Sequence, residues 1–200
     1  MKRTWTSTLG IVAGLAIFAL SPQSSQAFVT NSASATNDIV DIESSGTLFT
    51  SLNGSVNNAF DGDVTTQVQQ GSYPEYAGIY GMDKKYRLTG FTIANGNTGW
   101  RWFYQFRVEG SNDTTTGLDG SWTTIYEFPG SLDWQNTGRK LLYFDPKDEP
   151  SDPDIFNNDT AYHSFRLVII GGSGDAYAPE LSELEFFGYR VPDGMLITLH

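Results

Sequence analysis

Two carboxylates and a hydroxyl are closely spaced in the segment Asn58–Thr66, where Asp61-Gly62-Asp63 is followed by Thr66. Gly62 allows a tight turn between the two acids, because it has no Cβ to clash at positive φ. A hard cation such as Ca²⁺ takes about six to eight oxygen ligands from carboxylates, hydroxyls and backbone carbonyls. The segment can supply several of these, so it predicts a cation site. A simple Asp-Gly turn with solvated acids is the alternative interpretation of the same spacing.

A second segment, Asn95–Trp102, combines aromatic rings with planar polar groups. A sugar is recognised by a flat apolar surface against the C–H face of its ring and by a few planar polar groups at its hydroxyls. The candidate ligand-binding residues are Asn95, Asn97, Trp100, Arg101, Trp102 and, in a Gly-rich segment further along the chain, Tyr177. In the alternative interpretation, one tryptophan belongs to the core and the other covers the base of the loop.

Short β-prone segments separated by Gly, Asn, Asp and Pro must position these residues. Apolar and polar residues alternate in Phe91-Thr92-Ile93, Phe106-Arg107-Val108 and Phe165-Arg166-Leu167, which is typical of strands with one buried face. No stretch of ten or more residues keeps a helical period. The segments that we predict as strands are 39–42, 76–80, 88–94, 103–110, 122–128, 140–144, 163–170 and 184–189.

Several short strands at this spacing favour an all-β fold, either an antiparallel sandwich or a barrel. Chain order alone does not separate a jelly roll from an immunoglobulin-like sandwich. Two longer polar segments, 112–121 and 145–160, interrupt the strands. The second is acidic and carries three prolines, so we interpret it as a solvated loop and not as a second metal site.

The first 27 residues have the features of a secretory signal peptide: Lys2 and Arg3, the apolar run Leu9–Leu20, and a small residue at the end of Ser25-Gln26-Ala27. The apolar run is shorter than the roughly 20 residues that a membrane-spanning helix needs, although an uncleaved anchor is the alternative. We expect a secreted, extracellular protein with a signal peptide at 1–27, a linker at 28–37, one domain at 38–190 and a tail at 191–200.

The chain is acidic and has no cysteine. Its formal charge of −11 becomes −13 when Lys2 and Arg3 leave with the signal peptide. Such a surface repels phosphate backbones and anionic lipid heads, which disfavours nucleic acid and anionic membranes as partners. Neutral sugars and divalent cations remain compatible with it. Without disulfides, an exported domain must rely on its core, its hydrogen bonds and a bound ion.

Few residues suit catalysis. Glu183 and Glu185 would point to the same side of a strand and could in principle act as a glycosidase pair. His163 and His200 are the only histidines, so a Ser–His–Asp set or a zinc site is not supported. We therefore predict a non-catalytic protein without catalytic residues.

Six segments add a further pattern through their order along the chain: Asn58-Ala59-Phe60-Asp61-Gly62-Asp63, Tyr86-Arg87-Leu88-Thr89-Gly90-Phe91-Thr92-Ile93, Tyr104-Gln105-Phe106-Arg107-Val108-Glu109-Gly110-Ser111-Asn112-Asp113, Ser121-Trp122-Thr123-Thr124-Ile125, Ser164-Phe165-Arg166-Leu167-Val168-Ile169 and Leu181-Ser182-Glu183-Leu184-Glu185-Phe186-Phe187-Gly188. In this order they resemble the discoidin family, also called the coagulation factor 5/8 type C domain. Its bacterial members include the family 32 carbohydrate-binding modules. The resemblance covers about Asp38 to Tyr189.

The resemblance implies a galactose-binding-like jelly-roll β-sandwich with its ligand loops at one end and a structural Ca²⁺ beside them. By position, the implied ligands are the carbonyl of Asn58, the carboxylates of Asp61 and Asp63, Thr66, the carbonyl of Ser182 and the carboxylate of Glu183. Such an ion would join the first loop to the last strand, as a disulfide does elsewhere. The chain departs from the family at Gln67-Val68, where many members have a tryptophan that packs locally.

The function that these observations predict is a secreted, calcium-stabilised binding module for a carbohydrate or glycoconjugate. In it the ion fixes the geometry of the loops and does not touch the ligand. The alternative is a protein-interaction or cell-adhesion module of the same fold, without a sugar site and with other extracellular proteins as partners.

Overall fold

The computed structural model describes residues 45–69, 71–96, 103–128, 141–144, 156, 159–172 and 179–192. The expected signal peptide, the linker and the strand predicted at 39–42 lie outside these residues, as do most of the segment 145–160 and most of the tail. The elements, in chain order, are β1 (Thr47–Thr50), the 3₁₀ helix η1 (Val56–Ala59), β2 (Val68–Gln69), β3 (Glu75–Tyr80), β4 (Lys85–Asn95), β5 (Phe103–Ser111), β6 (Thr123–Glu127), β7 (Leu141–Phe144), β8 (Ser164–Gly172) and β9 (Glu180–Val191).

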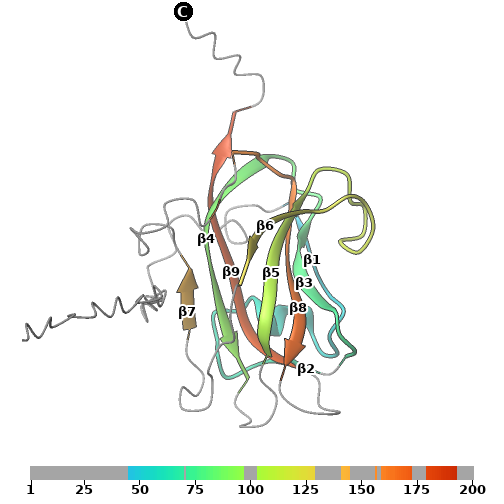
Figure 1. The fold of residues 1–200 in the computed structure, drawn as a ribbon, viewed down its shortest axis with the longest axis vertical. Coiled ribbons are helices and arrows are strands. Elements are labelled where there is room, and N and C mark those ends of the chain that lie inside the picture. Colours follow the sequence, from blue (N-terminus) through green and yellow to red (C-terminus); the bar gives the residue numbers. More distant parts are fainter. Residues whose placement is uncertain are drawn as a thin grey trace, which may run out of the picture.

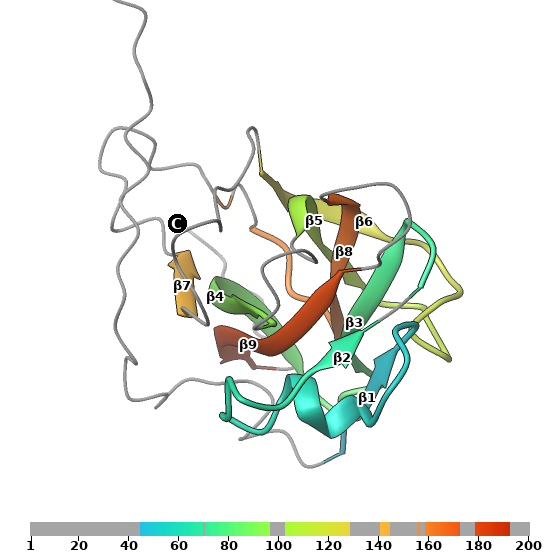
Figure 2. The same cartoon turned by 90° about the horizontal axis from the view of Figure 1, so that it is seen from below.

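The strands form two antiparallel sheets that face each other (Figures 1 and 2). One sheet has the order β1-β3-β8-β5-β6, and the other has the order β2-β9-β4-β7. Neighbouring strands within each sheet are mostly distant in the sequence, so the sandwich is held together by long-range pairing. The predicted all-β antiparallel sandwich is what the chain adopts.

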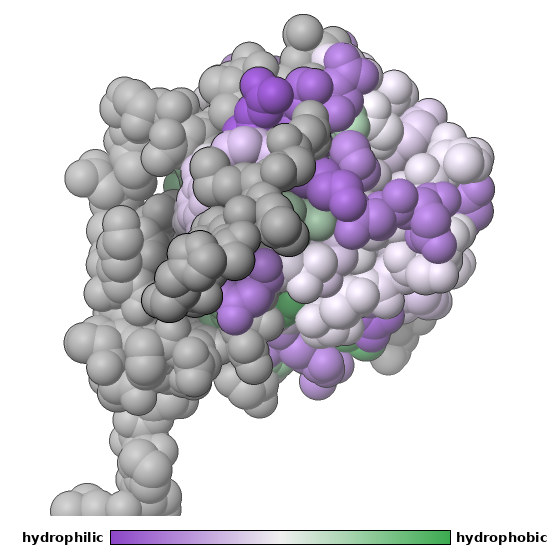
Figure 3. All heavy atoms as spheres, turned by 90° about the horizontal axis from the view of Figure 1, so that it is seen from above, coloured by the Kyte–Doolittle hydropathy of each residue, from purple (hydrophilic) through white to green (hydrophobic). Residues whose placement is uncertain are grey.

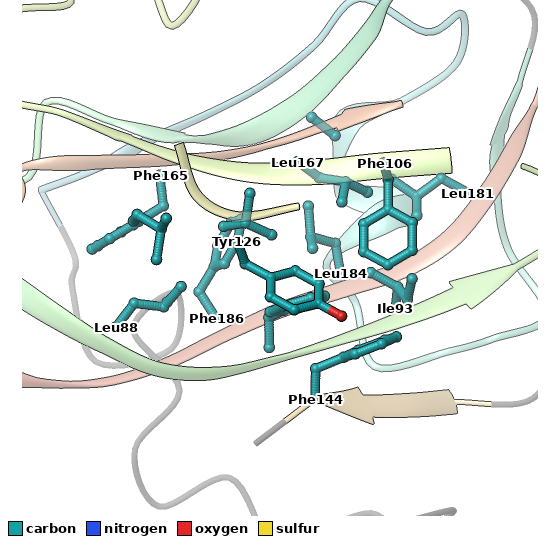
Figure 4. Close-up of a cluster of buried hydrophobic side chains, with 14 of the residues drawn as sticks. Leu88, Ile93, Phe106, Tyr126, Phe144, Phe165, Leu167, Leu181, Leu184 and Phe186 are labelled. Carbon is teal, nitrogen blue, oxygen red and sulfur yellow. The ribbon is translucent and has the colours of Figure 1, made fainter. Parts of the chain in front are cut away.

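The core lies between the two sheets and is rich in phenylalanine. Figure 4 shows side chains of one sheet, such as Phe106 and Leu167, meeting Ile93 and Leu184 of the other. Phe91 stacks on Phe144 with ring centroids 4.6 Å apart. Such an aromatic pair contributes about 0.5–1.5 kcal/mol beyond the burial of its surface. The chain has no cysteine, so this packed core stabilises the sandwich without disulfides.

Seven of the eight predicted strands correspond to observed ones, with shifted ends. The largest shift is in β9, which begins at Glu180 and not at residue 184. We did not predict β1 and β2, because both are short: β1 has four residues and β2 has two. The predicted alternation of buried and exposed faces is wrong at Thr92, which is 3% exposed, and at Arg166, which is 8% exposed. The outward faces of β4 and β8 are therefore also covered at these two positions.

Strand register brings the ends of two connections to the same end of the sandwich. Asn95, at the end of β4, lies opposite Leu181, near the start of β9. Phe103, at the start of β5, lies opposite Gly172, at the end of β8. In Figure 1 this end is at the bottom, together with β2. We call it the loop end; Lys85 and Val191 pair near the opposite end.

The described surface is largely polar or of intermediate hydropathy on the face shown in Figure 3. Among the described large apolar side chains, those exposed are Tyr73, Leu118 and Tyr189, and they do not belong to one element. In the parts of the chain that the structure describes, no helix has the length and apolar character needed to cross a bilayer.

Candidate functional site

The loop that follows η1 packs against β9, at the loop end of the sandwich. Contacts join η1 to β9, β1 and β2, and Figure 2 shows η1 beside β1 and β2. Asp61 of this loop is close enough to Glu183 of β9 for its charge to act on the Glu183 carboxyl. The two segments that the sequence analysis predicted to share an ion therefore lie next to each other.

The hydroxyl of Thr66 is surrounded by acceptor oxygens. Thr66 Oγ1 lies 3.2 Å from the carbonyl oxygen of Asn58, 2.8 Å from Oδ2 of Asp61 and 3.0 Å from the carbonyl oxygen of Asp63. A hydroxyl carries a single proton and can donate it to only one of these three oxygens at a time. Four converging oxygens with one proton among them fit a hard cation better than a hydrogen-bond network.

Both acids of the loop accept a hydrogen bond from the backbone amide two residues further on. Oδ1 of Asp61 accepts a hydrogen bond from the Asp63 amide at 2.9 Å, and Oδ1 of Asp63 accepts one from the Thr65 amide at 2.8 Å. Gly62 between them has a φ of 72°, as expected from its lack of a Cβ. The carbonyl of Asp63 faces the Thr66 hydroxyl, and the carboxylate of Asp63, which the resemblance implies as a ligand, has one oxygen in this turn.

Glu183 supplies a buried carboxylate to the same place. The residue is 1% exposed, and its Oε2 has no hydrogen-bond partner. Burial, together with the negative charges of Glu185 and Asp61, raises the pKa of the Glu183 carboxyl to about 8. A buried carboxylate without a counter-charge is costly, and either a proton or a cation relieves that cost.

The oxygens that converge here are of mixed type. Among the described residues, no group of three or more His, Cys, Asp or Glu side chains is arranged to hold a metal. Ca²⁺ does not require such a group, because it accepts carbonyl and hydroxyl oxygens as readily as carboxylates. Ser182, the other residue expected from β9, is fully buried, and its hydroxyl donates to the carbonyl of Asn95 at 2.9 Å.

The candidate ligand-binding residues are described only in part. Asn97, Trp100, Arg101, Trp102 and Tyr177 lie outside the described residues. Asn95 is 3% exposed, its Nδ2 donates to the Gly96 carbonyl at 3.3 Å, and its Oδ1 is buried without a partner. In this structure Asn95 therefore belongs to the buried base of the loop end and not to its surface.

Sequence reasoning missed a buried ion pair on the outer face of the five-stranded sheet. Nε and Nη2 of Arg166 both lie 2.7 Å from Oε2 of Glu109. The Arg166 guanidinium also lies 4.0 Å from the Trp122 ring and 4.7 Å from the Tyr76 ring. An arginine inside the apolar segment 165–170 was the only signal in the sequence. Arg166 also donates to the carbonyl of Gly117 at 3.3 Å, so it fastens the segment 112–122 to the sheet.

No protein-family model matches the chain, and no curated protein matches it either. Solved structures do. The family 32 carbohydrate-binding module of C. perfringens NanJ, solved with galactose, superimposes with a TM-score of 0.52 at 14% identity, covering 76% of this chain and 98% of the module. A second module from Clostridium perfringens, solved with GalNAc-β-1,3-galactose, gives a TM-score of 0.51 at 17% identity, with coverages of 72% and 95%. A third, from AlyQ with 4,5-unsaturated mannuronic acid, gives 0.51 at 17% identity, with coverages of 70% and 93%.

The chain has the fold of a family 32 carbohydrate-binding module. This is the galactose-binding-like sandwich that the resemblance to the discoidin family implied, so the predicted fold class is confirmed. At identities below 20% the likeness is one of fold. The match extends over nearly the whole length of each module.

Proposed function

We propose that this protein is a secreted, non-catalytic carbohydrate-binding module whose loop end binds a glycan. The observation that carries the proposal is the strand register at the loop end. The pairs Asn95–Leu181 and Phe103–Gly172 bring together, at the loop end, the described residues that flank the segments 97–102 and 173–178. Together these segments contain two tryptophans, one arginine and one tyrosine, which are suited to stacking on a sugar and donating to its hydroxyls.

The fold relatives support a carbohydrate as the ligand, since the modules of NanJ and AlyQ were solved with sugars. Their sugars differ in charge, and the acidic composition of this chain favours a neutral glycan. In this proposal the aromatic side chains provide most of the contact area, and the planar polar side chains set orientation.

We also propose that one Ca²⁺ ion stabilises the module. The residues that would hold it are Asn58 and Asp63 through their carbonyls, Asp61 and Glu183 through their carboxylates, Thr66 through its hydroxyl, and Ser182 through its carbonyl. The ion would supply positive charge to a cluster of acceptor oxygens that is short of donors. Its role would be to fasten the first loop to the last strand.

A glycan array followed by calorimetric titration of the best glycan tests the main proposal. We expect the parent protein to bind at least one neutral glycan and the Trp100→Ala, Trp102→Ala double variant to lose that binding. Tyr189→Ala is the control, because Tyr189 is an exposed aromatic residue near the opposite end. An array without any bound glycan, or a double variant that binds like the parent, would instead favour a protein-interaction or adhesion module.

A further inference from the structure

Tyr73 is an exposed aromatic residue at the loop end. Among the described residues, the exposed large apolar side chains are those of Tyr73, Leu118 and Tyr189, and Tyr73 is 37% exposed. Leu118 follows the end of β5 that lies away from the loop end, and Tyr189 lies near the opposite end of the sandwich. Tyr73 comes two residues before Glu75, the first residue of β3. Of these three side chains, Tyr73 is therefore the one that a ligand at the loop end can reach.

The end of β8 next to Tyr73 is formed by two glycines. β8 lies between β3 and β5, and it ends in Gly171-Gly172 (Figure 1). Glu75 pairs with Ile169, so the chain before Glu75 runs along the β3 side of this glycine end. On the β5 side, the exposed Gln105 pairs with Gly171, and a Cβ placed on Gly171 would lie 2.9 Å from Oε1 of Gln105. The glycine end thus lies between an aromatic and an amide side chain, the two kinds of group that recognise a sugar.

Tyr104 and Glu75 lie near the Tyr73 hydroxyl. Burial, together with the negative charges of ionised Tyr104 and of Glu75, raises the pKa of this hydroxyl, so the three side chains are close together. Tyr104 precedes Gln105 in β5 and is half-buried against the core. The Tyr73 hydroxyl is therefore held beside the sheet, while part of the side chain remains open to solvent.

Glu75 places a negative charge beside Tyr73. The residue is 3% exposed, and its Oε2 accepts a hydrogen bond from the hydroxyl of Ser51. A Cβ placed on Gly71 would lie 1.5 Å from Oε1 of Glu75, so the segment that leads to Tyr73 lies directly against the carboxylate. None of the ion pairs between described residues includes Glu75. An anionic group brought to Tyr73 would therefore be repelled, because a charge buried in a low dielectric acts strongly on its surroundings.

We infer that Tyr73 is a stacking platform for one sugar ring of the glycan, and that Glu75 makes this platform selective for neutral sugars over uronic acids. The inference rests on the proposed function, to which it adds a contact residue and a specificity-determining residue. The Tyr73 ring packs against the apolar C–H face of the sugar, and the Gln105 amide bonds to a hydroxyl. The Glu75 carboxylate repels a sugar carboxylate and accepts a neutral hydroxymethyl group in its place.

Calorimetric titration of the full chain with two probes tests the inference. One probe is the neutral oligosaccharide that binds best on the glycan array, and the other is the same oligosaccharide with its C6 hydroxymethyl groups oxidised to carboxylates. The parent should bind the neutral probe about tenfold or more tightly than the acidic one, because like charges disfavour the wrong partner.

Two substitutions at Tyr73 separate stacking from a structural role. Tyr73→Ala should weaken binding of the neutral probe by about tenfold or more, because the sugar loses its aromatic surface. Tyr73→Phe keeps the ring and should bind within about threefold of the parent. Tyr189→Ala removes an exposed tyrosine from the opposite end and should match the parent.

Glu75→Gln tests the selectivity. It keeps an acceptor for Ser51 and should bind the neutral probe within about threefold of the parent, while the preference over the acidic probe falls by about fivefold or more. Asp83→Asn removes one exposed negative charge between β3 and β4 and should keep the preference of the parent.

Several outcomes would overturn the inference: a parent without preference, a Tyr73→Ala variant that binds like the parent, or a Tyr73→Phe variant as weak as Tyr73→Ala. A Glu75→Gln variant that keeps the full preference, or that no longer binds the neutral probe, would overturn it as well. If only the Trp100→Ala, Trp102→Ala double variant lost binding, the proposed function would stand and this inference alone would fail. An array without any bound glycan would overturn both.

Discussion

Asp61, in the loop after η1, lies close enough to Glu183 of β9 for its negative charge to raise the pKa of the Glu183 carboxyl. The two residues come from opposite ends of the folded domain's sequence. Two carboxylates held near each other and partly away from water repel unless a cation or a proton lies between them.

Replacing Glu183 by glutamine should abolish the stabilisation of the protein by calcium. The substitution keeps the shape of the side chain and removes its buried charge, so the ion-free variant should melt at the temperature of the ion-free parent or above it. Thermal melting with CaCl₂ and with chelator measures both effects. In the parent, chelator should lower Tm by several degrees, and added Ca²⁺ should restore it. Glu185→Gln, one of the half-buried neighbours, should keep most of the shift; a full calcium shift in Glu183→Gln would contradict the assignment.

The stability of the ion-free protein should fall as the pH rises. The pKa of Glu183 is about 8 in the folded protein and 4.5 as its ordinary value, so the folded state holds this proton more tightly. The resulting stabilisation is fully present below pH 4.5 and is lost as the pH rises through about 8. One pKa unit corresponds to about 1.4 kcal/mol, so the stabilisation that is lost amounts to about 5 kcal/mol. Urea unfolding of the chelated protein between pH 5 and 9 measures it.

Glu183→Gln is the control for this pH dependence, because it lacks the titrating group. It should remove most of the decline in stability between pH 5 and 8. Saturating Ca²⁺ should do the same in the parent, since an ion stabilises the ionised carboxylate. A parent and a variant that decline equally would show that other groups cause the effect.

The Thr66→Val substitution should weaken calcium binding by about tenfold or more, because it removes a neutral oxygen ligand and leaves the size of the side chain almost unchanged. It also removes a hydrogen bond worth about 1 kcal/mol to the ion-free protein. Calorimetric titration measures the affinity for Ca²⁺. Thr65→Val is a matched control: the amide of Thr65 donates to Asp63, and that bond does not involve the side chain. Equal affinities in the two variants would argue against a role of the Thr66 hydroxyl.

Replacing Arg166 by methionine should destabilise the fold by about 3 kcal/mol or more, because it leaves Glu109 buried without its main partner. It also removes the cation that lies over Trp122 and Tyr76. Urea unfolding followed by tryptophan fluorescence measures the loss. The double variant Arg166→Met, Glu109→Met should recover part of it, since neither charge is then left alone. Arg107→Gln is the milder control, because this arginine is 33% exposed and a partly exposed ion pair is worth about 1 kcal/mol or less.

The sequence predicted those features that depend on short segments. Alternation around Phe91 and Phe106 identified strands, and Asp61-Gly62-Asp63 identified a turn rich in oxygens. Features that depend on register could not be predicted in this way. The burial of Asn95 follows from its pairing with Leu181, and the place of Gln69 opposite Glu180 follows from the pairing of β2 with β9. Neither pairing is visible in a segment read alone.

The orientation of Asp63 shows a second limit. A carboxylate in a loop can bind an ion or close the turn that contains it, and the residue types are the same in both cases. Oδ1 of Asp63 accepts a hydrogen bond from the Thr65 amide, and the Asp63 carbonyl oxygen lies 3.0 Å from the Thr66 hydroxyl. Only coordinates separate these two arrangements.

A crystal structure grown with CaCl₂, with anomalous diffraction data, tests the central claim most directly. We predict a single strong anomalous peak enclosed by Asn58, Asp61, Asp63, Thr66 and Glu183, with the Thr66 hydroxyl and a Glu183 oxygen both in contact with the ion. A map without a peak at this place, or with Glu183 turned away from a bound ion, would contradict the account.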